Sequence, residues 1–224
     1  MSGKLIVFEG TDGSGKATQT ALLCRYLEGA GVPYRKITFP RYGQPSAAMV
    51  QAYLGGELGK HPGDVNAYAA TLFYAVDRYA SYKQDWGGFY ENGGLIVADR
   101  YTTSNAVHQA SKLPDGERET YLDWLFDLEY RLLGLPSPDK VLYLDMPAAA
   151  SERMLRQREA AGGGPADIHE QDQAYLAQCR QNAREVVRRC GWQVIPCAEG
   201  GVPRTPEEIH VLVREALKEL VPVL

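Results

Sequence analysis

The sequence predicts an α/β fold in which helices cover both faces of a parallel sheet of five strands. Two patterns support this prediction: five short β-rich runs alternate with longer segments of helical periodicity, and a glycine-rich loop directly follows the first run. The composition agrees, because 45% of the 224 residues are hydrophobic and 23% are charged, as in a globular protein with one substantial core. We therefore expect one domain, covering residues 1–224.

The expected strands are short runs rich in β-branched and apolar residues: Leu5–Glu9, Tyr34–Phe39, Leu95–Ala98, Val141–Asp145 and Gln193–Pro196. The other segments carry apolar residues at helical spacing, and several end at Gly or Pro: Gly15–Gly29, Val65–Tyr82, Gly116–Leu133, Ala148–Arg158, Glu170–Arg189 and Thr205–Leu220. Strands separated by helices of this length form a parallel sheet, because each helix crosses over and returns the chain to the same edge.

Charge, apolar runs and cysteine spacing limit the classes of partner. The 24 basic and 28 acidic residues give a net charge of −4, so we expect neither a nucleic-acid partner nor an anionic membrane partner. The run Leu5-Ile-Val-Phe8 is too short for a signal-peptide core, and no run approaches the ~20 residues that span a bilayer, which predicts a cytoplasmic protein. The four cysteines form no C-x-x-C pair, so we expect reduced thiols and neither a disulfide nor a zinc site.

The first expected strand ends at Glu9 and leads into Gly10-Thr-Asp-Gly-Ser-Gly-Lys16, which precedes an expected helix. This order is the setting of a P-loop, in which glycines let consecutive backbone N–H groups surround a phosphate while the lysine reaches the β and γ phosphates. The sequence therefore predicts the P-loop NTPase fold, binding of a nucleoside triphosphate and a catalytic role for Lys16 in phosphoryl transfer. The expected ATP-binding residues here are Gly10, Thr11, Asp12, Gly13, Ser14, Gly15, Lys16, Ala17 and Thr18.

The residue after Lys16 is Ala17, where the motif normally has a Ser or Thr that coordinates Mg²⁺. Thr18 comes next, but one position turns a helical side chain by about 100°, so Thr18 cannot take the same geometry. We therefore expect the Mg²⁺ that accompanies ATP to be held through water or by other carboxylates.

Two charged runs follow expected strands. Phe39-Pro-Arg-Tyr42 comes after the second strand, and Asp99-Arg-Tyr101 comes after the third. Ligands of open α/β sheets bind where the carboxyl ends of the strands meet, so these runs and Asp12 should surround one site. They supply what phosphoryl transfer needs, namely arginines that neutralise phosphates and a carboxylate near the attacking oxygen.

Five motifs together resemble those of thymidylate kinases and occur in the same order: Phe8-Glu-Gly-Thr-Asp-Gly-Ser-Gly-Lys16, Phe39-Pro-Arg-Tyr42, Phe73-Tyr-Ala-Val-Asp-Arg78, Asp99-Arg-Tyr101 and Asp167-Ile-His-Glu170. The resemblance spans nearly the whole chain. It implies a single nucleoside monophosphate kinase domain, with a lid at about residues 153–170, that uses ATP and Mg²⁺ to phosphorylate dTMP to dTDP for dTTP synthesis. It also implies a homodimer.

The resemblance assigns roles on the acceptor side. Arg100, with Arg41 and Tyr42, resembles the clamp on the dTMP phosphate, and a planar guanidinium suits two phosphate oxygens. Asp99 resembles the carboxylate close to the transferring group, and Asp12 resembles the residue near the sugar 3′-hydroxyl and the metal. The dTMP-binding residues implied are Asp12, Phe39, Pro40, Arg41, Tyr42, Tyr74, Arg78, Arg100, Ser104, Asn105, His108, Gln109 and Glu170, and Asp99 and Arg100 are implied to be catalytic.

Base recognition in the family pairs an aromatic ring that stacks on thymine with an arginine four residues later on the same helix face. That spacing selects Tyr74 with Arg78, while Phe73, about 100° away, is expected in the core. The polar residues that resemble those around the thymine ring are Ser104, Asn105 and Gln109. His108 stands where several relatives have a tyrosine that excludes a ribose 2′-hydroxyl, and it either affects sugar selectivity or is only a polar residue on a helix.

Some relatives have a basic residue directly after the P-loop aspartate, but this chain has Gly13 there and so resembles the members that supply charge from lid arginines. The patch Ala160-Ala-Gly-Gly-Gly-Pro165 is either part of such a lid or a plain flexible connector. Arg156 and Arg158, just before it, are the candidates for the transition-state cation, and Arg153 resembles the residue that stacks on adenine. The competing interpretation of this basic stretch is a solvated helix face.

The missing hydroxyl at Ala17 makes carboxylates more important for the metal. Asp167-Ile-His-Glu170 places two carboxylates in a family position that faces the acceptor nucleotide and the metal region. We therefore expect Asp12 and Glu170 to contact Mg²⁺, directly or through water.

Three other functions share a P-loop. Another nucleoside monophosphate kinase, acting on dUMP, UMP or CMP, would not call for an aromatic residue four positions before an arginine. A GTPase would need an N/T-K-x-D guanine motif, and Asp139-Lys-Val-Leu lacks the aspartate that reads the base. A pseudoenzyme that binds nucleotide without turnover is suggested only by Ala17.

Overall fold

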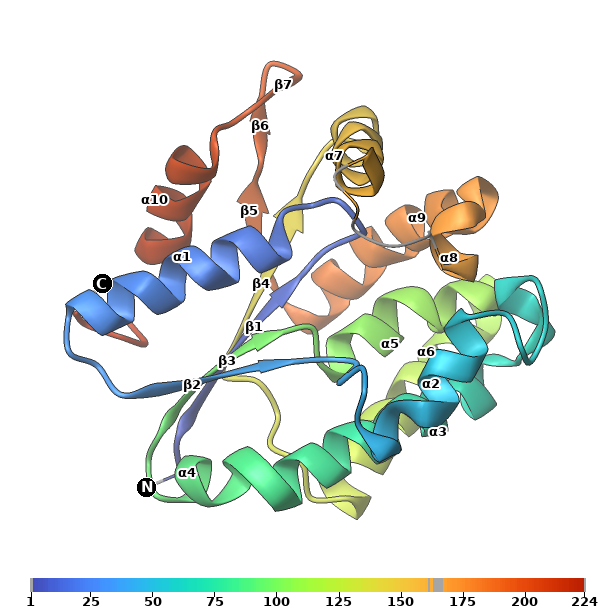
Figure 1. Cartoon of the computed structure of the whole chain (residues 1–224), viewed down its shortest axis with the longest axis horizontal. Helices are drawn as coiled ribbons and strands as arrows, with labels where there is room; N and C mark the ends of the chain where they lie inside the picture. Colours follow the sequence, from blue (N-terminus) through green and yellow to red (C-terminus); the bar gives the residue numbers. More distant parts are fainter. Residues whose placement is uncertain (1, 161, 163–166, 224) are drawn as a thin grey trace.

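The computed structural model describes residues 2–160, 162 and 167–223, and a five-stranded sheet lies at its centre (Figure 1). The strands are β1 (Lys4–Glu9), β2 (Tyr34–Thr38), β3 (Leu95–Asp99), β4 (Lys140–Asp145) and β5 (Gln193–Pro196), in the order β2-β3-β1-β4-β5. All neighbouring strands pair in parallel. The predicted five-stranded parallel sheet is confirmed.

The six segments expected to be helical contain the longer helices of the described chain. These are α1 (Lys16–Gly29), α3 (Ala67–Ser81), α6 (Asp115–Phe126), α7 (Ala148–Ala160), α9 (Gln173–Cys190) and α10 (Pro206–Leu217). Four shorter helices were not predicted: α2 (Ala48–Leu54), α4 (Gly87–Glu91), α5 (Thr102–His108) and α8 (Ile168–Gln171). Each has at most two turns, which is too short for an apolar repeat to stand out in the sequence.

Several single turns connect these elements. Two π-helical turns, η3 (Tyr82–Trp86) and η5 (Asp127–Leu132), extend α3 and α6, and the 3₁₀ turns are η1 (Pro45–Ala47), η2 (Pro62–Asp64) and η4 (Ala110–Lys112). A small antiparallel hairpin of β6 (Ala198–Glu199) and β7 (Val202–Pro203) precedes α10.

The central strands are buried on both faces, which explains why β1 is a continuous apolar run rather than an alternating one. Ile6 and Phe8 pack toward α1 and α10, whereas Leu5 and Val7 pack toward Trp86 of η3. In Figure 1, α1 and α10 lie above the sheet and α3 and α4 lie below it. The core therefore has two layers, and the carboxyl ends of β1, β2 and β3 are left to carry the loops of the site.

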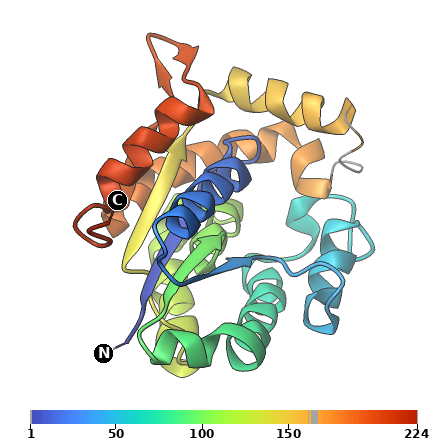
Figure 2. The ribbon, with the colours of Figure 1, turned by 60° about the vertical axis from the view of Figure 1, so that its left-hand side comes forward.

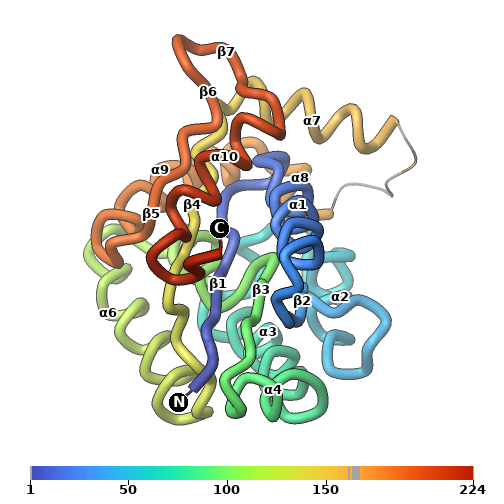
Figure 3. Tube along the Cα trace, turned by 90° about the vertical axis from the view of Figure 1, so that its left-hand side faces the viewer, coloured from blue at the N-terminus to red at the C-terminus, as the bar shows by residue number. Residues whose placement is uncertain are grey.

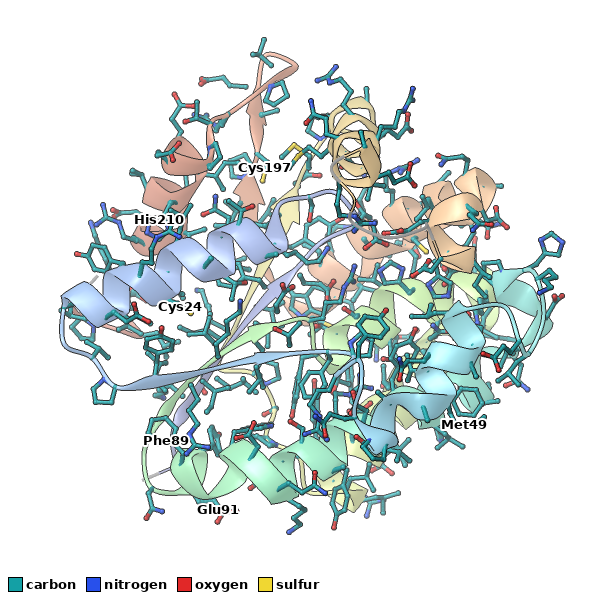
Figure 4. All side chains as sticks on the ribbon, viewed as in Figure 1. Cys24, Met49, Phe89, Glu91, Cys197 and His210 are labelled. Atoms are coloured by element: carbon teal, nitrogen blue, oxygen red, sulfur yellow. The ribbon has the colours of Figure 1, made fainter. Side chains whose placement is uncertain are left out.

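All four cysteines are free, and two of them, Cys179 and Cys190, lie on α9. Figure 4 labels Cys24 on α1 and Cys197 just after β5. Both are buried, and burial raises the pKa of each thiol above its usual value, as for unreactive structural cysteines. None of the helices in the described part of the chain is long and apolar enough to cross a membrane.

Candidate active site

A cavity of about 490 Å³ opens at the carboxyl ends of the strands, and the residues that line it fall between Asp12 and Glu170 of the chain. Most of the predicted site residues line it: Asp12, Gly13, Gly15, Lys16, Ala17, Thr18, Phe39, Pro40, Tyr42, Tyr74, Arg78, Asp99, Arg100, Ser104, Asn105, His108, Gln109, Arg158 and Glu170. The predicted residues that do not line it are Gly10, Thr11, Ser14, Arg41, Arg153 and Arg156.

The cavity wall also contains residues that the sequence did not single out, namely Leu54 from α2, Met154 and Leu155 from α7, and His169 from α8. Apolar side chains in a binding site carry the same sequence pattern as core side chains, so Leu54 and Leu155 could not be distinguished in advance. His169 lies inside the Asp167–Glu170 motif, and that motif was the only signal for it.

The P-loop is folded so that glycine is required at two of its corners. Gly13 and Gly15 have φ values of 75° and 89°, in the left-handed region that favours glycine. Gly13 also meets α7, because a Cβ built on it would lie 2.3 Å from the backbone oxygen of Ser151. Residue 13 is therefore limited to glycine by the helix that carries the candidate lid arginines.

The ammonium of Lys16 lies inside the P-loop and donates to the carbonyl oxygens of Gly10, at 2.8 Å, and Thr11, at 2.9 Å. Burial, followed by the charge of Arg100, lowers the pKa of Lys16 from its ordinary value to about 8. An anion beside this lysine would raise the pKa again, because it stabilises the charged ammonium. The environment of Lys16 therefore favours the binding of a phosphate.

Arg100 stands at the centre of the cavity in a strained backbone conformation. Its φ is 68°, and among the described residues other than glycine it alone has a positive φ. One guanidinium nitrogen bonds the carboxylate of Asp12, and the other donates to Ser104 at 3.2 Å and lies 3.3 Å from Nε2 of His108. Burial opposes the charge of Arg100, but Asp12 and Glu9 outweigh it and raise its pKa above the ordinary value.

Glu9, at the end of β1, contacts both the P-loop and Arg100. Its buried carboxylate accepts hydrogen bonds from the backbone N–H of Gly10 and the hydroxyls of Thr103 and Ser104, and it lies 3.8 Å from Arg100. One carboxylate therefore joins the P-loop to the start of α5. The sequence placed Glu9 only at the end of a strand, because nothing in the local pattern indicates partners more than 90 residues away.

Asp99 differs from the other carboxylates of the cavity. Asp12 is bonded to Arg100 and Glu170 to Arg158, but the Asp99 side chain, which lines the cavity, has no hydrogen-bonding partner among the described residues. Its oxygens are thus free to accept a bond from a ligand or to contact a metal ion.

A buried ion pair includes one residue of the cavity wall, Arg78. Arg78, on α3, bonds the carboxylate of Glu129 through Nε, at 2.7 Å, and through NH2, which also donates to Oδ1 of Asn105 at 3.0 Å. The Nδ2 group of Asn105 donates to Thr71 at 3.1 Å. Burial opposes the charge of Arg78, but Glu129 outweighs it and raises the pKa. The remaining nitrogen, NH1, has no partner among the described residues.

The tyrosine expected beside Arg78 is in place, since Tyr74 lines the cavity one helical turn earlier. Phe73 does not line the cavity, although both rings are half-buried and pack against the cluster that contains Val50 and Leu54. This arrangement fits the prediction from helical spacing.

Arg41 is held outside the cavity wall. Its backbone N–H and its Nε both bond the carboxylate of Asp77, at 2.8 and 3.1 Å, and its NH2 donates to Ser46 at 2.9 Å. Tyr42, the next residue, does line the cavity. The implied role of Arg41 on a phosphate thus requires its guanidinium to reach past these partners.

The three arginines of α7 have different surroundings. Arg158 lines the cavity and donates to both carboxylate oxygens of Glu170, at 2.7 and 2.8 Å. Arg156 is 77% exposed and lies 3.8 Å from Glu152 on its own helix, and Arg153 is also exposed. Figures 2 and 3 show α7 extending away from the sheet toward α8. Most of the patch 160–165 lies outside the described residues.

His108 is buried beside Arg100 and stacks on His169, with ring centroids 6.0 Å apart and an angle of 17° between the planes. Burial, followed by the charge of Arg100, lowers the pKa of His108 to about 3. The imidazole is therefore neutral near pH 7, and Nε2 can accept the hydrogen bond from Arg100.

Comparison with known proteins agrees with this geometry. The family model described as thymidylate kinase matches residues 8–209. The thymidylate kinase of Mycobacterium tuberculosis (strain ATCC 25618 / H37Rv) is 34% identical over 170 residues, which are 75% of this chain and 78% of that protein. The thymidylate kinase of Synechococcus sp. (strain WH7803) is 30% identical over 221 residues, or 97% of this chain and 96% of that one.

A solved structure supports the fold independently. The thymidylate kinase from Candida albicans aligns with a TM-score of 0.71 at 20% sequence identity, covering 100% of this chain and 94% of its own. The family model covers most of the chain, and its range includes the P-loop, the acceptor motifs and α7. The chain belongs to the thymidylate kinase family.

Proposed function

We propose that this protein is an ATP-dependent dTMP kinase, which transfers the γ-phosphoryl group of ATP to dTMP and releases ADP and dTDP. The observation that carries this proposal is the arrangement of the cavity. Its wall contains the P-loop with Lys16, Tyr74, and Arg78 bonded to Asn105. Arg100 bonds both Asp12 of the P-loop and Ser104 of α5, the residue next to Asn105. A donor and an acceptor nucleotide can thus meet phosphate to phosphate at Arg100.

The free nitrogen of Arg78 favours thymine or uracil over cytosine as the acceptor base. A guanidinium can only donate hydrogen bonds, and thymine and uracil present an O4 acceptor where cytosine presents an N4 donor. Because Glu129 fixes the other side of the guanidinium, Arg78 cannot turn away to avoid a cytosine amino group. Leaving a buried polar group unpaired in this way discriminates strongly between substrates.

A coupled assay for ADP release tests the proposed function. With ATP and Mg²⁺ and a panel of dTMP, dUMP, UMP and dCMP, we expect the highest kcat/KM for dTMP and turnover of dCMP lower by at least about 10²-fold. A better rate with dCMP would contradict the assignment of Arg78. Failure of every acceptor, with ATP binding intact, would favour a nucleotide-binding protein without turnover.

The donor set of the cavity fits Mg²⁺ that arrives with ATP. The described residues contain no group of three His, Cys, Asp or Glu side chains that could hold a metal ion alone. Magnesium does not need one, because it usually keeps several waters and binds to one or two carboxylates plus substrate phosphates. Asp12, Asp99 and Glu170 all face the cavity, and we propose that they contact the ion, in part through water. When bound, Mg²⁺ neutralises charge on the β and γ phosphates.

The chain's own residues then supply positioning and charge. Lys16 and the P-loop N–H groups hold the donor phosphates, Arg100 holds the acceptor phosphate, and Arg158 faces the same space from α7. The acceptor is a phosphate oxygen and is already ionised near pH 7, so no protein nucleophile or covalent intermediate is needed. Asp99, whose carboxylate lines the cavity, is the residue that we assign to the attacking oxygen and the metal.

The pKa of Lys16 predicts a pH dependence of ATP binding. In the free protein this pKa is lowered to about 8, and a triphosphate beside the ammonium raises it again. Binding is therefore fully favourable below pH 8 and weakens as the pH rises through 8, because the lysine must then take up a proton. Calorimetric titration with a non-hydrolysable ATP analogue should give a Kd about tenfold higher at pH 9 than at pH 7.

The matched control for this measurement is Lys16→Arg, whose guanidinium stays charged throughout. Its Kd should change little over the same pH range, whatever its absolute value. Equal pH dependence in both proteins would assign the effect to another group.

We also propose a homodimer formed through α3. Four of its exposed residues, Tyr68, Leu72, Val76 and Tyr79, recur at helical spacing and make an apolar stripe, with Val76 58% exposed. A second copy of the chain would cover this stripe by symmetry. Val76→Glu should therefore shift the mass measured by light scattering from dimer to monomer. Val211→Glu, an equally exposed valine on α10, should not, and a monomeric unsubstituted protein would disprove the dimer.

A further inference from the structure

The short helix α8 carries a residue that bonds an arginine of the cavity. It comprises only Ile168–Gln171, yet it carries Glu170, the carboxylate that Arg158 bonds through two contacts. Isolated helices this short are unstable in water, so their position depends on the contacts that anchor them. The orientation of Arg158 in the cavity therefore depends on what holds α8 in place.

Several contacts of the described residues hold α8 in place. Asp167 caps its first turn by accepting from the N–H groups of His169 and Glu170, at 2.9 and 3.0 Å. Ile168 is buried in a cluster that includes Leu54 and the ring of Tyr53. Nε2 of His169 lies 2.7 Å from the hydroxyl of Tyr53, and the two rings meet edge to face with centroids 5.3 Å apart. The last of these contacts is a polar link between α8 and α2.

The hydroxyl of Tyr53 is the centre of a larger buried network. It accepts from Nζ of Lys112 at 2.8 Å and lies 3.2 Å from the carbonyl oxygen of Pro62. Lys112 donates in addition to the carbonyl oxygen of Val65 at 2.9 Å, and its ammonium lies 4.8 Å from the centre of the Tyr53 ring. One oxygen atom thus joins α2, the segment before α3, η4 and α8.

Neither Tyr53 nor Lys112 lines the cavity, so neither is placed to touch a nucleotide. Tyr53 is only 1% exposed, and its hydroxyl and the ammonium of Lys112 satisfy one another in an environment where an unpaired polar group is costly. A network of this kind holds its members in one arrangement. The segment that it fixes on the far side is α8.

We propose that Tyr53, Lys112 and His169 are positioning residues for phosphoryl transfer, which fix α8 so that Glu170 holds Arg158 toward the reacting phosphates. The inference rests on the proposed function, because it assigns these residues a place in that reaction. They act in sequence: Lys112 and Pro62 fix the Tyr53 hydroxyl, the hydroxyl fixes His169, and the neighbouring Glu170 fixes Arg158.

Amide hydrogen exchange tests the anchor without substrates. In Tyr53→Phe the ring and its packing remain but the hydroxyl is lost, and the amides of residues 168–171 should exchange about fivefold faster. Tyr82→Phe is the matched control, since its hydroxyl also makes a 2.7 Å bond, to Glu91, at the other end of the molecule. Unchanged exchange at α8 in Tyr53→Phe would overturn the proposal, even if the protein phosphorylates dTMP.

Steady-state kinetics then test the link to Arg158. Tyr53→Phe and Lys112→Met should each lower kcat about fivefold with the KM for dTMP changed by less than about twofold, whereas Tyr82→Phe should keep the original kcat. In an Arg158→Ala background the further loss caused by Tyr53→Phe should disappear, because the hydroxyl acts through that arginine. An equal loss in both backgrounds, or a loss confined to KM, would overturn the proposal. No turnover by the unsubstituted protein would count against the proposed function alone.

Discussion

Arg158→Ala is expected to lower kcat by about 10³-fold, with a much smaller change in the KM for either nucleotide. Phosphoryl transfer spreads negative charge over the equatorial oxygens of the transferring group, and a cation that faces them stabilises the transition state more than the ground state. Gly13 leaves the P-loop without a cation at that position. Among the arginines of α7, Arg158 alone lines the cavity.

Arg156→Ala is the matched control for this prediction. It removes the same charge from the same helix two residues away, but Arg156 is 77% exposed and forms an ion pair with Glu152 on its own helix. Its kcat should stay within about threefold of the original, because exposed ion pairs contribute little. The sequence left the choice between these two arginines open. If Arg156→Ala proved the more damaging of the two, the choice made from the cavity lining would be wrong.

Glu129→Ala is expected to lower the free energy of unfolding by about 3–5 kcal/mol, the largest stability effect that we predict for a single substitution. The side chains of Glu129 and Arg78 are 0% and 1% exposed, so removing the carboxylate would leave a guanidinium charge buried without a partner. Glu129 also bonds the hydroxyl of Thr102 at 2.6 Å, which loses its acceptor as well. Urea unfolding followed by circular dichroism measures the change.

The same π-helical turn provides a control. Asp127 forms an ion pair with Arg131, but both side chains are exposed, so Asp127→Ala should unfold at nearly the original urea concentration. A second test uses Arg78→Met with Glu129→Ala. The double variant should be more stable than Glu129→Ala, since the unpaired charge is gone. If Glu129→Ala and Asp127→Ala had equal effects, the buried pair would not be a source of stability.

The sheet and the P-loop could be predicted from the sequence because both are determined by residues that are close together in the chain. A strand buried on both faces needs an uninterrupted apolar run such as Leu5-Ile-Val-Phe8, and glycine at positive φ is needed at Gly13 and Gly15. The spacing of Tyr74 and Arg78 is equally local, as both lie on one helix. These signals depend only on residues within one or two turns of each other.

The parts that escaped prediction depend on residues far apart in the chain. Arg78 is held by Glu129, 51 residues later, and that carboxylate points inward from a π-helical turn that has no sequence signature. Arg41 is tied to Asp77, 36 residues away, so a residue expected on the phosphate lies outside the cavity wall. Partner choice of this kind is decided by tertiary packing, and no local spacing encodes it.

The contact between Gly13 and the backbone of Ser151 limits how this enzyme can change over evolutionary time. Relatives that carry a basic side chain after the P-loop aspartate supply a cation from the loop, but any side chain at position 13 here would collide with the first turns of α7. A single substitution therefore cannot convert one arrangement into the other. A basic residue at position 13 would require α7 to shift, and on the role that we propose for Arg158 such a shift would withdraw that arginine from the phosphates. The two sources of charge would then exclude one another.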